Sequence, residues 1–135
     1  MNTKIIIYTD GGARGNPGPA AIGVLIGNRG YAEAIGKATN NVAEYKAIIF
    51  ALKKAKVLVG SEKAGETELE VRSDSELIVH QLNGKYKVKD VNLRILFDEA
   101  IKAKQAYKKV VFLHIPREKN QIADGLLNDA LDALV

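Results

Sequence analysis

Two acidic residues close apolar stretches of this sequence, where an acid is a poor choice for a core strand. Asp10 follows the apolar run "KIIIYT", and Asp74 follows the alternating run "TELEVRS". Each has a simple structural explanation, because Asp-Gly favours a turn and an acid before a helix is stabilised by the helix dipole. In an α/β sheet, however, functional sites form beyond the carboxyl ends of the strands. Asp10 and Asp74 are therefore candidate site residues.

Two further acids lie on helical stripes that are otherwise apolar. Glu44 shares a stripe with Ile48, which is the face that a packed helix turns toward a sheet. A helix-start charge in the first helical turn is the competing explanation for Glu44. Asp124 aligns with Leu127 and Leu131, where a lone charge is partly desolvated and costly unless it is paired.

Carboxylates gathered at one sheet end repel one another, and some of them stay protonated unless cations compensate the charge. Mg²⁺ prefers carboxylate, phosphate and water oxygens. Two such ions a few ångström apart can activate water and stabilise the leaving oxygen in phosphodiester cleavage. The four acids therefore predict metal-assisted phosphoryl chemistry.

The composition excludes several other kinds of functional site. The chain has no cysteine and only two histidines, which excludes disulfides, thiolate zinc sites, cysteine nucleophiles and a histidine-rich metal centre. The net charge of +4 is compatible with a polyanionic partner, although lysine clusters such as "GKYKVKD" and "KAKQAYKK" are also typical of solvated faces. The apolar runs are shorter than the roughly 20 residues of a membrane span, and no signal-peptide pattern opens the chain. We expect a cytoplasmic protein with no membrane contact.

The elements that position the acids follow from periodicity. A strand ending at Asp10 precedes a hairpin around "NRG", and a helical period begins at Asn41 and stops at Gly60. The later elements are the strand "TELEVRSD", the helix "SELIVHQLNG" capped by Ser75, the helix "VNLRILFDEAIKAKQAY", the strand "KVVFLHI" and the helix "NQIADGLLNDALDALV". The order β-β-β-α-β-α-α-β-α predicts a single α/β domain over residues 1–135, with helices on both faces of a mixed five-stranded sheet.

The glycine-rich segment "GGARGNPG" matches neither a P-loop nor a dinucleotide-binding fingerprint. It is either a tight connection between two strands or a surface where backbone and Asn16 touch a nucleic-acid groove. Both interpretations stay open, because glycine serves either purpose.

Four motifs resemble those of the type 1 ribonuclease H family, in order and over nearly the whole chain: "YTDGGARGNPGP", "TNNVAEYKA", "SDSELIV" and "PREKNQIAD". The resemblance implies an RNase H-like fold and an endonuclease that hydrolyses the RNA strand of RNA/DNA hybrids, leaving 3′-hydroxyl and 5′-phosphate ends. It implies two Mg²⁺ ions per substrate-bound site, with Mn²⁺ as a substitute, held by the catalytic residues Asp10, Glu44, Asp74 and Asp124.

The same resemblance implies a set of hybrid-contacting residues: Gly11, Asn16, Asn40, Asn41 and Ser75, with Thr39 near a DNA phosphate. Small amides and exposed backbone suit the shallow minor groove in which RNA displays its 2′-hydroxyls. The "TNN" triplet also fits a plain helix cap.

Two departures from the family pattern are visible. The interval "QLNGKYKVKDVNL" leaves no room for the basic protrusion of some members, so Lys85, Lys87 and Lys89 are candidates for phosphate contacts. Many members carry a histidine on a loop before the last aspartate, but His114 falls within a strand pattern. Arg117 is the candidate for that auxiliary role, because a guanidinium holds phosphate bidentately, and a surface ion pair is its alternative.

The sequence thus supports a metal-dependent nuclease acting as a monomer with no obligatory protein partner. The alternative is a non-catalytic module that binds RNA/DNA hybrids. Retention of all four acids argues against the module, because binding alone gains nothing from negative charge beside a phosphate. An ATPase on a related fold is disfavoured by the missing nucleotide loops.

Overall fold

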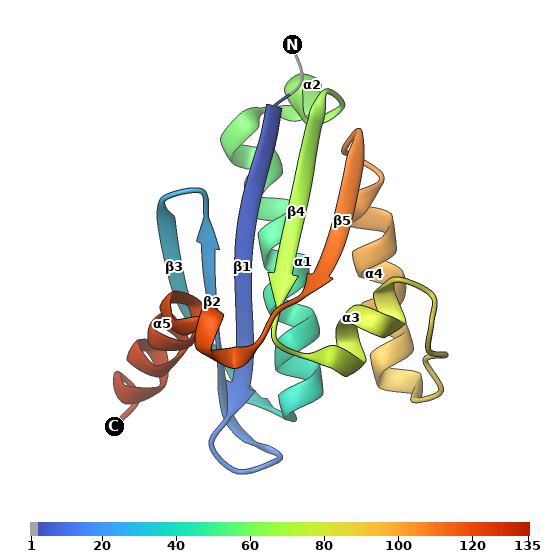
Figure 1. The fold of residues 1–135 in the computed structure, drawn as a ribbon. Coiled ribbons are helices and arrows are strands. Elements are labelled where there is room, and N and C mark those ends of the chain that lie inside the picture. The colour runs from blue at the N-terminus through green and yellow to red at the C-terminus, as the bar shows by residue number, and fades with distance from the viewer. Residues whose placement is uncertain (1–2) are drawn as a thin grey trace.

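Five strands form one mixed sheet in the computed structural model, which describes residues 3–135 (Figure 1). The strands are β1 Thr3–Ala13, β2 Gly18–Ile26, β3 Arg29–Ala38, β4 Thr67–Ser73 and β5 Lys109–His114. Their order in the sheet is β3-β2-β1-β4-β5. The first three strands are joined in antiparallel pairs, and β4 and β5 continue the sheet parallel to β1.

The helices cover the two faces of this sheet unequally. They are α1 Asn40–Val59, α2 Ser61–Ala64, α3 Glu76–Leu82, α4 Val91–Lys104 and α5 Gln121–Asp132, with a 3₁₀ turn, η1, at Arg117–Lys119. α1 and α4 pack together behind the sheet, while α5 lies on the opposite face beside β1, β2 and β3 (Figure 1). The predicted mixed sheet with helices on both faces is confirmed.

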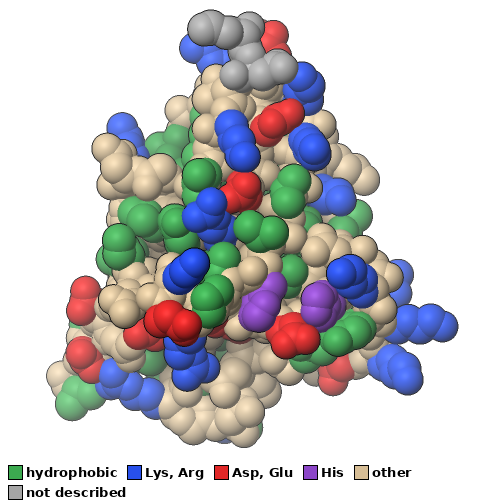
Figure 2. All heavy atoms as spheres, viewed as in Figure 1, with side chains coloured by type: hydrophobic (Ala, Val, Ile, Leu, Met, Phe, Trp, Pro, Cys, Tyr) green, Lys and Arg blue, Asp and Glu red, His purple; other side chains and the backbone are tan. Residues whose placement is uncertain are grey.

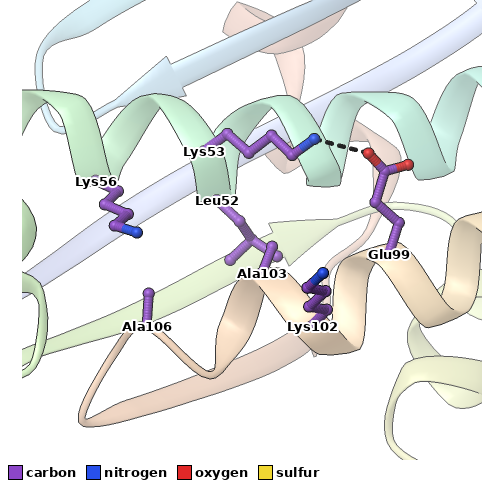
Figure 3. Close-up of a pocket in the computed structure, with 7 residues that line it drawn as sticks. All are labelled: Leu52, Lys53, Lys56, Glu99, Lys102, Ala103 and Ala106. Atoms are coloured by element: carbon purple, nitrogen blue, oxygen red, sulfur yellow. Dashed lines mark hydrogen bonds and ion pairs between the residues drawn. The ribbon is translucent and has the colours of Figure 1, made fainter.

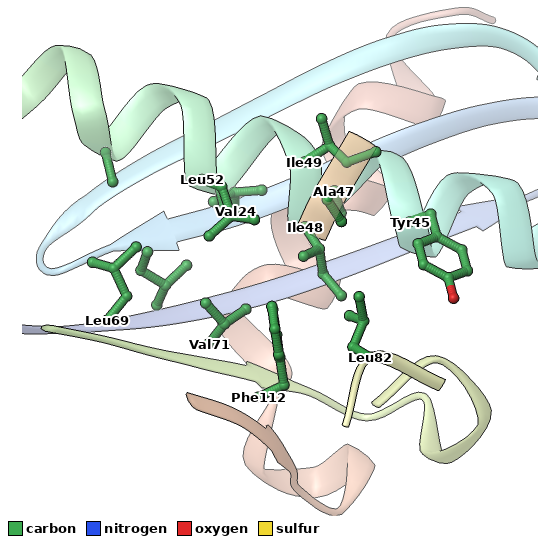
Figure 4. Packing of buried hydrophobic residues seen from close by; sticks show 14 of the residues in the cluster. Val24, Tyr45, Ala47, Ile48, Ile49, Leu52, Leu69, Val71, Leu82 and Phe112 are labelled. Carbon is green, nitrogen blue, oxygen red and sulfur yellow. The ribbon is translucent and has the colours of Figure 1, made fainter. Parts of the chain in front are cut away.

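The core lies between α1 and the sheet (Figure 4). Strand β4 alternates strictly between buried and half-buried residues, so that Leu69 and Val71 point toward α1. The predicted stripe of α1 is buried at Ile48, Ala51 and Ala55. Fully burying an aliphatic side chain of the size of Ile48 stabilises the fold by roughly 1.5–3 kcal/mol. This packing fixes α1, and with it Glu44, against the strands.

Several boundaries differ from the prediction, and α4 and α5 end earlier than expected, at Lys104 and Asp132. β1 continues past Asp10 to Ala13, because its last residues still pair with β2. Glu44 lies in the second turn of α1, which begins at Asn40, so the predicted first-turn position is wrong. The short elements α2 and η1 are absent from the predicted order.

The segment 83–90 between α3 and α4 contains neither helix nor strand. No helix among residues 3–135 is long and apolar enough to cross a membrane.

Candidate active site

The end of the parallel pairing between β1 and β4 places two of the predicted acids side by side. The last paired residues are Thr9 and Ser73, and Asp10 and Asp74 come immediately after them. Beyond this point β1 pairs only with β2, where Asp10 lies opposite Gly23. Asp10 and Asp74 therefore lie together where the parallel pairing ends, as the sequence predicts.

Glu44 reaches this edge because α1 approaches β1 very closely. A Cβ atom on Gly11 would collide with the carbonyl group of Ala43, so only glycine allows this approach. The Gly11 amide donates a hydrogen bond of 2.7 Å to Oε1 of Glu44. Glu44 is only 9% exposed and is held by the backbone of the residue that follows Asp10.

Asp124 comes from the opposite face, and a second glycine allows its approach. A Cβ atom on Gly23 would collide with the carbonyl oxygen of Ala123 and the amide of Leu127. Leu127 and Leu131 lie on the buried face of α5, as their spacing with Asp124 predicts. Because Gly23 pairs with Asp10 across the strands, the contact between Gly23 and α5 places Asp124 close to Asp10.

All four predicted carboxylates line one hollow of about 290 Å³. Carboxylate oxygens of Asp10, Glu44 and Asp74 lie within 4.8 Å of one another. The full lining is Asp10, Gly11, Gly12, Asn40, Glu44, Asp74, Arg117, Asp124 and Leu127.

This crowding disfavours the charged forms of the two most buried acids. Burial raises the pKa of Asp10 to about 7, and the charges of Asp74 and Asp124 add to the effect. Burial also raises the pKa of Glu44 well above its usual range, with Asp10 and Asp74 contributing. A cluster of acids that resists ionisation on its own is the donor set that a hard divalent cation compensates. The residues present therefore fit Mg²⁺ or a similar ion.

Of the predicted substrate-contacting residues, Gly11 and Asn40 line this hollow. Asn16 and Asn40 also organise the backbone beside it. Asn16 Oδ1 accepts a hydrogen bond of 2.9 Å from the Asn40 amide, and Asn40 Oδ1 accepts one of 2.9 Å from the Ala13 amide. The two asparagines thereby join the loop after β1 to the start of α1. Both interpretations of the glycine-rich segment are compatible with this arrangement.

Two other predicted residues cap helices. Thr39 accepts a hydrogen bond from the Val42 amide at 3.2 Å, and Ser75 accepts one from the Ile78 amide at 3.4 Å. Asn41 is exposed at the first turn of α1. Thr39 also lines a groove of about 490 Å³ whose polar lining residues, Lys37, Lys46 and Asn92, the sequence did not single out.

Arg117 and His114 are placed differently with respect to the acids. Arg117 is exposed on η1 and lines the carboxylate hollow, whereas His114 is the exposed last residue of β5 and is not among the lining residues. Both histidines of the chain are visible on the face shown in Figure 2. The prediction that His114 is a strand residue is confirmed.

Sequence reasoning missed Asn120, a buried residue at the start of α5 that bonds to Asp74. Its position one helical turn before Asp124 was the available signal. A larger groove of about 410 Å³ between α1 and α4 holds the ion pair of Lys53 and Glu99 and contains none of the predicted site residues (Figure 3).

The chain resembles known proteins along almost its entire length. A family model described as "Reverse transcriptase-like" matches residues 8–130. The bifunctional protein Rv2228c of Mycobacterium tuberculosis is 40% identical over 137 residues, covering 96% of this chain and 36% of that protein. Ribonuclease HI of Halobacterium salinarum is 39% identical over 135 residues, covering 96% of this chain and 65% of that protein. The chain thus spans less than two-thirds of the length of these relatives.

One solved structure matches this chain over nearly the full length of both proteins. The crystal structure of LC11-RNase H1 in complex with an RNA/DNA hybrid has 51% sequence identity and a TM-score of 0.90, covering 97% of this chain and 99% of that chain.

Proposed function

We propose that this chain, which belongs to the type 1 ribonuclease H family, hydrolyses the RNA strand of RNA/DNA hybrids at its four-carboxylate hollow. The observation that carries the proposal is the convergence of four acids that lie far apart in the sequence: Asp10 of β1, Glu44 of α1, Asp74 just after β4, and Asp124 of α5. A similar chain has been crystallised with an RNA/DNA hybrid. The products are 5′-phosphate and 3′-hydroxyl ends.

The four acids hold divalent metal ions, two when substrate is bound, with Mg²⁺ as the natural ion and Mn²⁺ as a substitute. Such ions supply activation of water and stabilisation of the leaving oxygen in phosphodiester hydrolysis. The raised pKa values of Asp10 and Glu44 support this assignment, because both groups gain from a compensating positive charge. The protein keeps the oxygens preorganised through the bond from the Gly11 amide to Glu44.

The hybrid lies across the hollow and the start of α1. Gly11, Asn16, Asn40, Asn41 and Ser75 contact the minor groove, where 2′-hydroxyl groups distinguish RNA from DNA. The groove beside Thr39 takes a phosphate of the DNA strand, since it also offers Lys37, Lys46 and Asn92. This arrangement separates recognition of the two strands.

Arg117 assists turnover by holding a substrate or product phosphate at the rim of the carboxylate hollow. Its place in the lining supports this role, and a guanidinium suits bidentate binding of phosphate oxygens. The enzyme acts as a monomer without an obligatory protein partner, which light scattering tests directly.

The deciding experiment is cleavage of an end-labelled RNA/DNA hybrid with Mg²⁺, beside single-stranded RNA and duplex DNA. Wild type is compared with Asp10→Asn and with an EDTA control. Cutting confined to the hybrid and dependent on both metal and Asp10 is the expected result. Binding of hybrid without cleavage in Mg²⁺ or Mn²⁺ would instead identify a non-catalytic binding module.

A further inference from the structure

Asn120 occupies the junction between the carboxylate hollow and the start of α5. Its side chain is 1% exposed, which makes it one of the most buried polar residues among those described. Nδ2 donates one hydrogen bond of 2.8 Å to the Thr9 carbonyl oxygen and another of 3.1 Å to Oδ2 of Asp74. A single amide group thus joins Thr9, the last residue of β1 that pairs with β4, to the acid that follows β4.

The orientation of this amide is fixed by its partners. The Thr9 carbonyl and the Asp74 carboxylate are both acceptors, so rotating the amide by half a turn would place oxygen against oxygen. In the observed orientation Oδ1 of Asn120 is buried and has no hydrogen-bond partner among residues 3–135. A buried oxygen without a partner destabilises a fold. The Asn120 side chain therefore keeps its two donor hydrogen bonds, to Thr9 and Asp74, although its oxygen has no partner.

The main chain of Asn120 adds a third connection. Its carbonyl oxygen accepts a hydrogen bond of 3.0 Å from the Asp124 amide at the start of α5. Asn120 therefore contacts Asp74 directly, the residue before Asp10, and the backbone of Asp124. No other described side chain shares hydrogen bonds with Asp74.

We propose that Asn120 is a positioning residue that orients the Asp74 carboxylate for metal binding by occupying Oδ2 and leaving Oδ1 toward the hollow. The proposal rests on the proposed function, because it assumes that Asp74 is a metal ligand. Hydrogen-bonding partners of metal ligands commonly set ligand orientation, and their removal weakens metal binding about 10–100-fold.

Asn83 provides a matched control. Its Nδ2 donates to the Phe112 carbonyl oxygen at 3.0 Å, which is the same amide-to-strand bond in a place that touches none of the four acids. A general loosening of the fold would follow from removing either asparagine side chain. A specific effect on the metal would follow only from removing that of Asn120.

The test measures Mn²⁺ binding by isothermal titration calorimetry to the full chain without nucleic acid, for wild type, Asn120→Ala and Asn83→Ala. We expect binding by Asn120→Ala to weaken at least about tenfold, with Asn83→Ala within about twofold of wild type. Equal affinities for Asn120→Ala and wild type would overturn the inference and leave the proposed function intact. Absence of binding by wild type would count against the proposed function itself.

A second measurement uses wild type alone, in case Asn120→Ala does not fold. The side-chain amide signals of Asn120 and Asn83 are followed by NMR during a Mg²⁺ titration, together with the backbone amide of Gly11. The Asn120 and Gly11 signals are expected to shift with one dissociation constant, while the Asn83 signals stay in place. A Gly11 shift with an unmoved Asn120 signal would refute the positioning role.

Discussion

Replacing Asp10 by Asn is expected to stabilise the metal-free protein at alkaline pH. The Asp10 side chain is 7% exposed, and its pKa rises from 3.8 to about 7 through burial and the neighbouring acids. Each unit of this pKa difference makes ionisation of Asp10 less favourable in the folded chain than in the unfolded chain by about 1.4 kcal/mol. At pH values above 7, where Asp10 is ionised in both states, the fold is therefore destabilised by at most about 4 kcal/mol.

The sign of the pH dependence follows from the same two values. The folded chain holds the Asp10 proton more tightly than the unfolded chain, so stability falls as pH rises between 3.8 and about 7. Asn carries no charge at any pH and escapes this loss. The gain from Asp10→Asn is expected to be about 2–4 kcal/mol at pH 8 and below about 1 kcal/mol at pH 4.

Urea unfolding in EDTA, followed by circular dichroism at pH 8 and pH 4, measures both values. Glu33→Gln is the control, because Glu33 is an exposed acid on β3, away from the hollow. Adding Mg²⁺ is expected to stabilise wild type and not Asp10→Asn, since a ligand stabilises the state that binds it. A gain of equal size at both pH values, or no gain at pH 8, would refute the electrostatic reasoning.

Three further predictions concern backbone approach, charge and turnover. Gly11→Ala is expected to lower the free energy of unfolding by about 3 kcal/mol or more in the same urea assay, because the new Cβ atom collides with the backbone of Ala43. Gly125→Ala, whose Cβ atom meets open space in α5, is expected to raise it by about 0.5–1 kcal/mol. Joint replacement of Lys85, Lys87 and Lys89 by Ala lowers the slope of log affinity against log salt by about 0.9 for each phosphate that these lysines neutralise, and an unchanged slope would exclude their binding to phosphate. Arg117→Ala lowers kcat roughly tenfold in steady-state cleavage assays, and Arg117→Lys does not restore it, because an ammonium group cannot bind phosphate bidentately.

Local pattern was sufficient to predict the elements that carry the site. The alternation in β4 places Leu69 and Val71 in the core and leaves Asp74 at the strand end, as its period of two requires. The stripe of α1 orients Glu44 in the same way. These inferences involve residues a few positions apart, where chain geometry determines which side chains share a face.

The hydrogen bonds of Asn120 were beyond such reasoning. Its bond to the Thr9 carbonyl joins residues 111 positions apart, and a sequence pattern specifies no pairing at that distance. The extension of β1 to Ala13 was missed for a related reason. The Asp-Gly pair at Asp10 and Gly11 favours a turn, but pairing with Gly23 and Ile22 of β2 keeps both residues in the sheet.

The gathering of the four acids depends on two residues that have no side chain, Gly11 and Gly23. Gly11 faces α1 and its pairing partner is Ile22, while the adjacent pair joins Asp10 to Gly23, which faces α5. Because successive residues of a strand point to opposite faces, one helix approaches from each side at neighbouring positions. Asp10 therefore meets Glu44 from one helix and Asp124 from the other, and Asp74 arrives from the adjacent strand. A side chain at either glycine would displace a helix and its acid together, so the geometry of the proposed metal site is determined by where the backbone can make close contact.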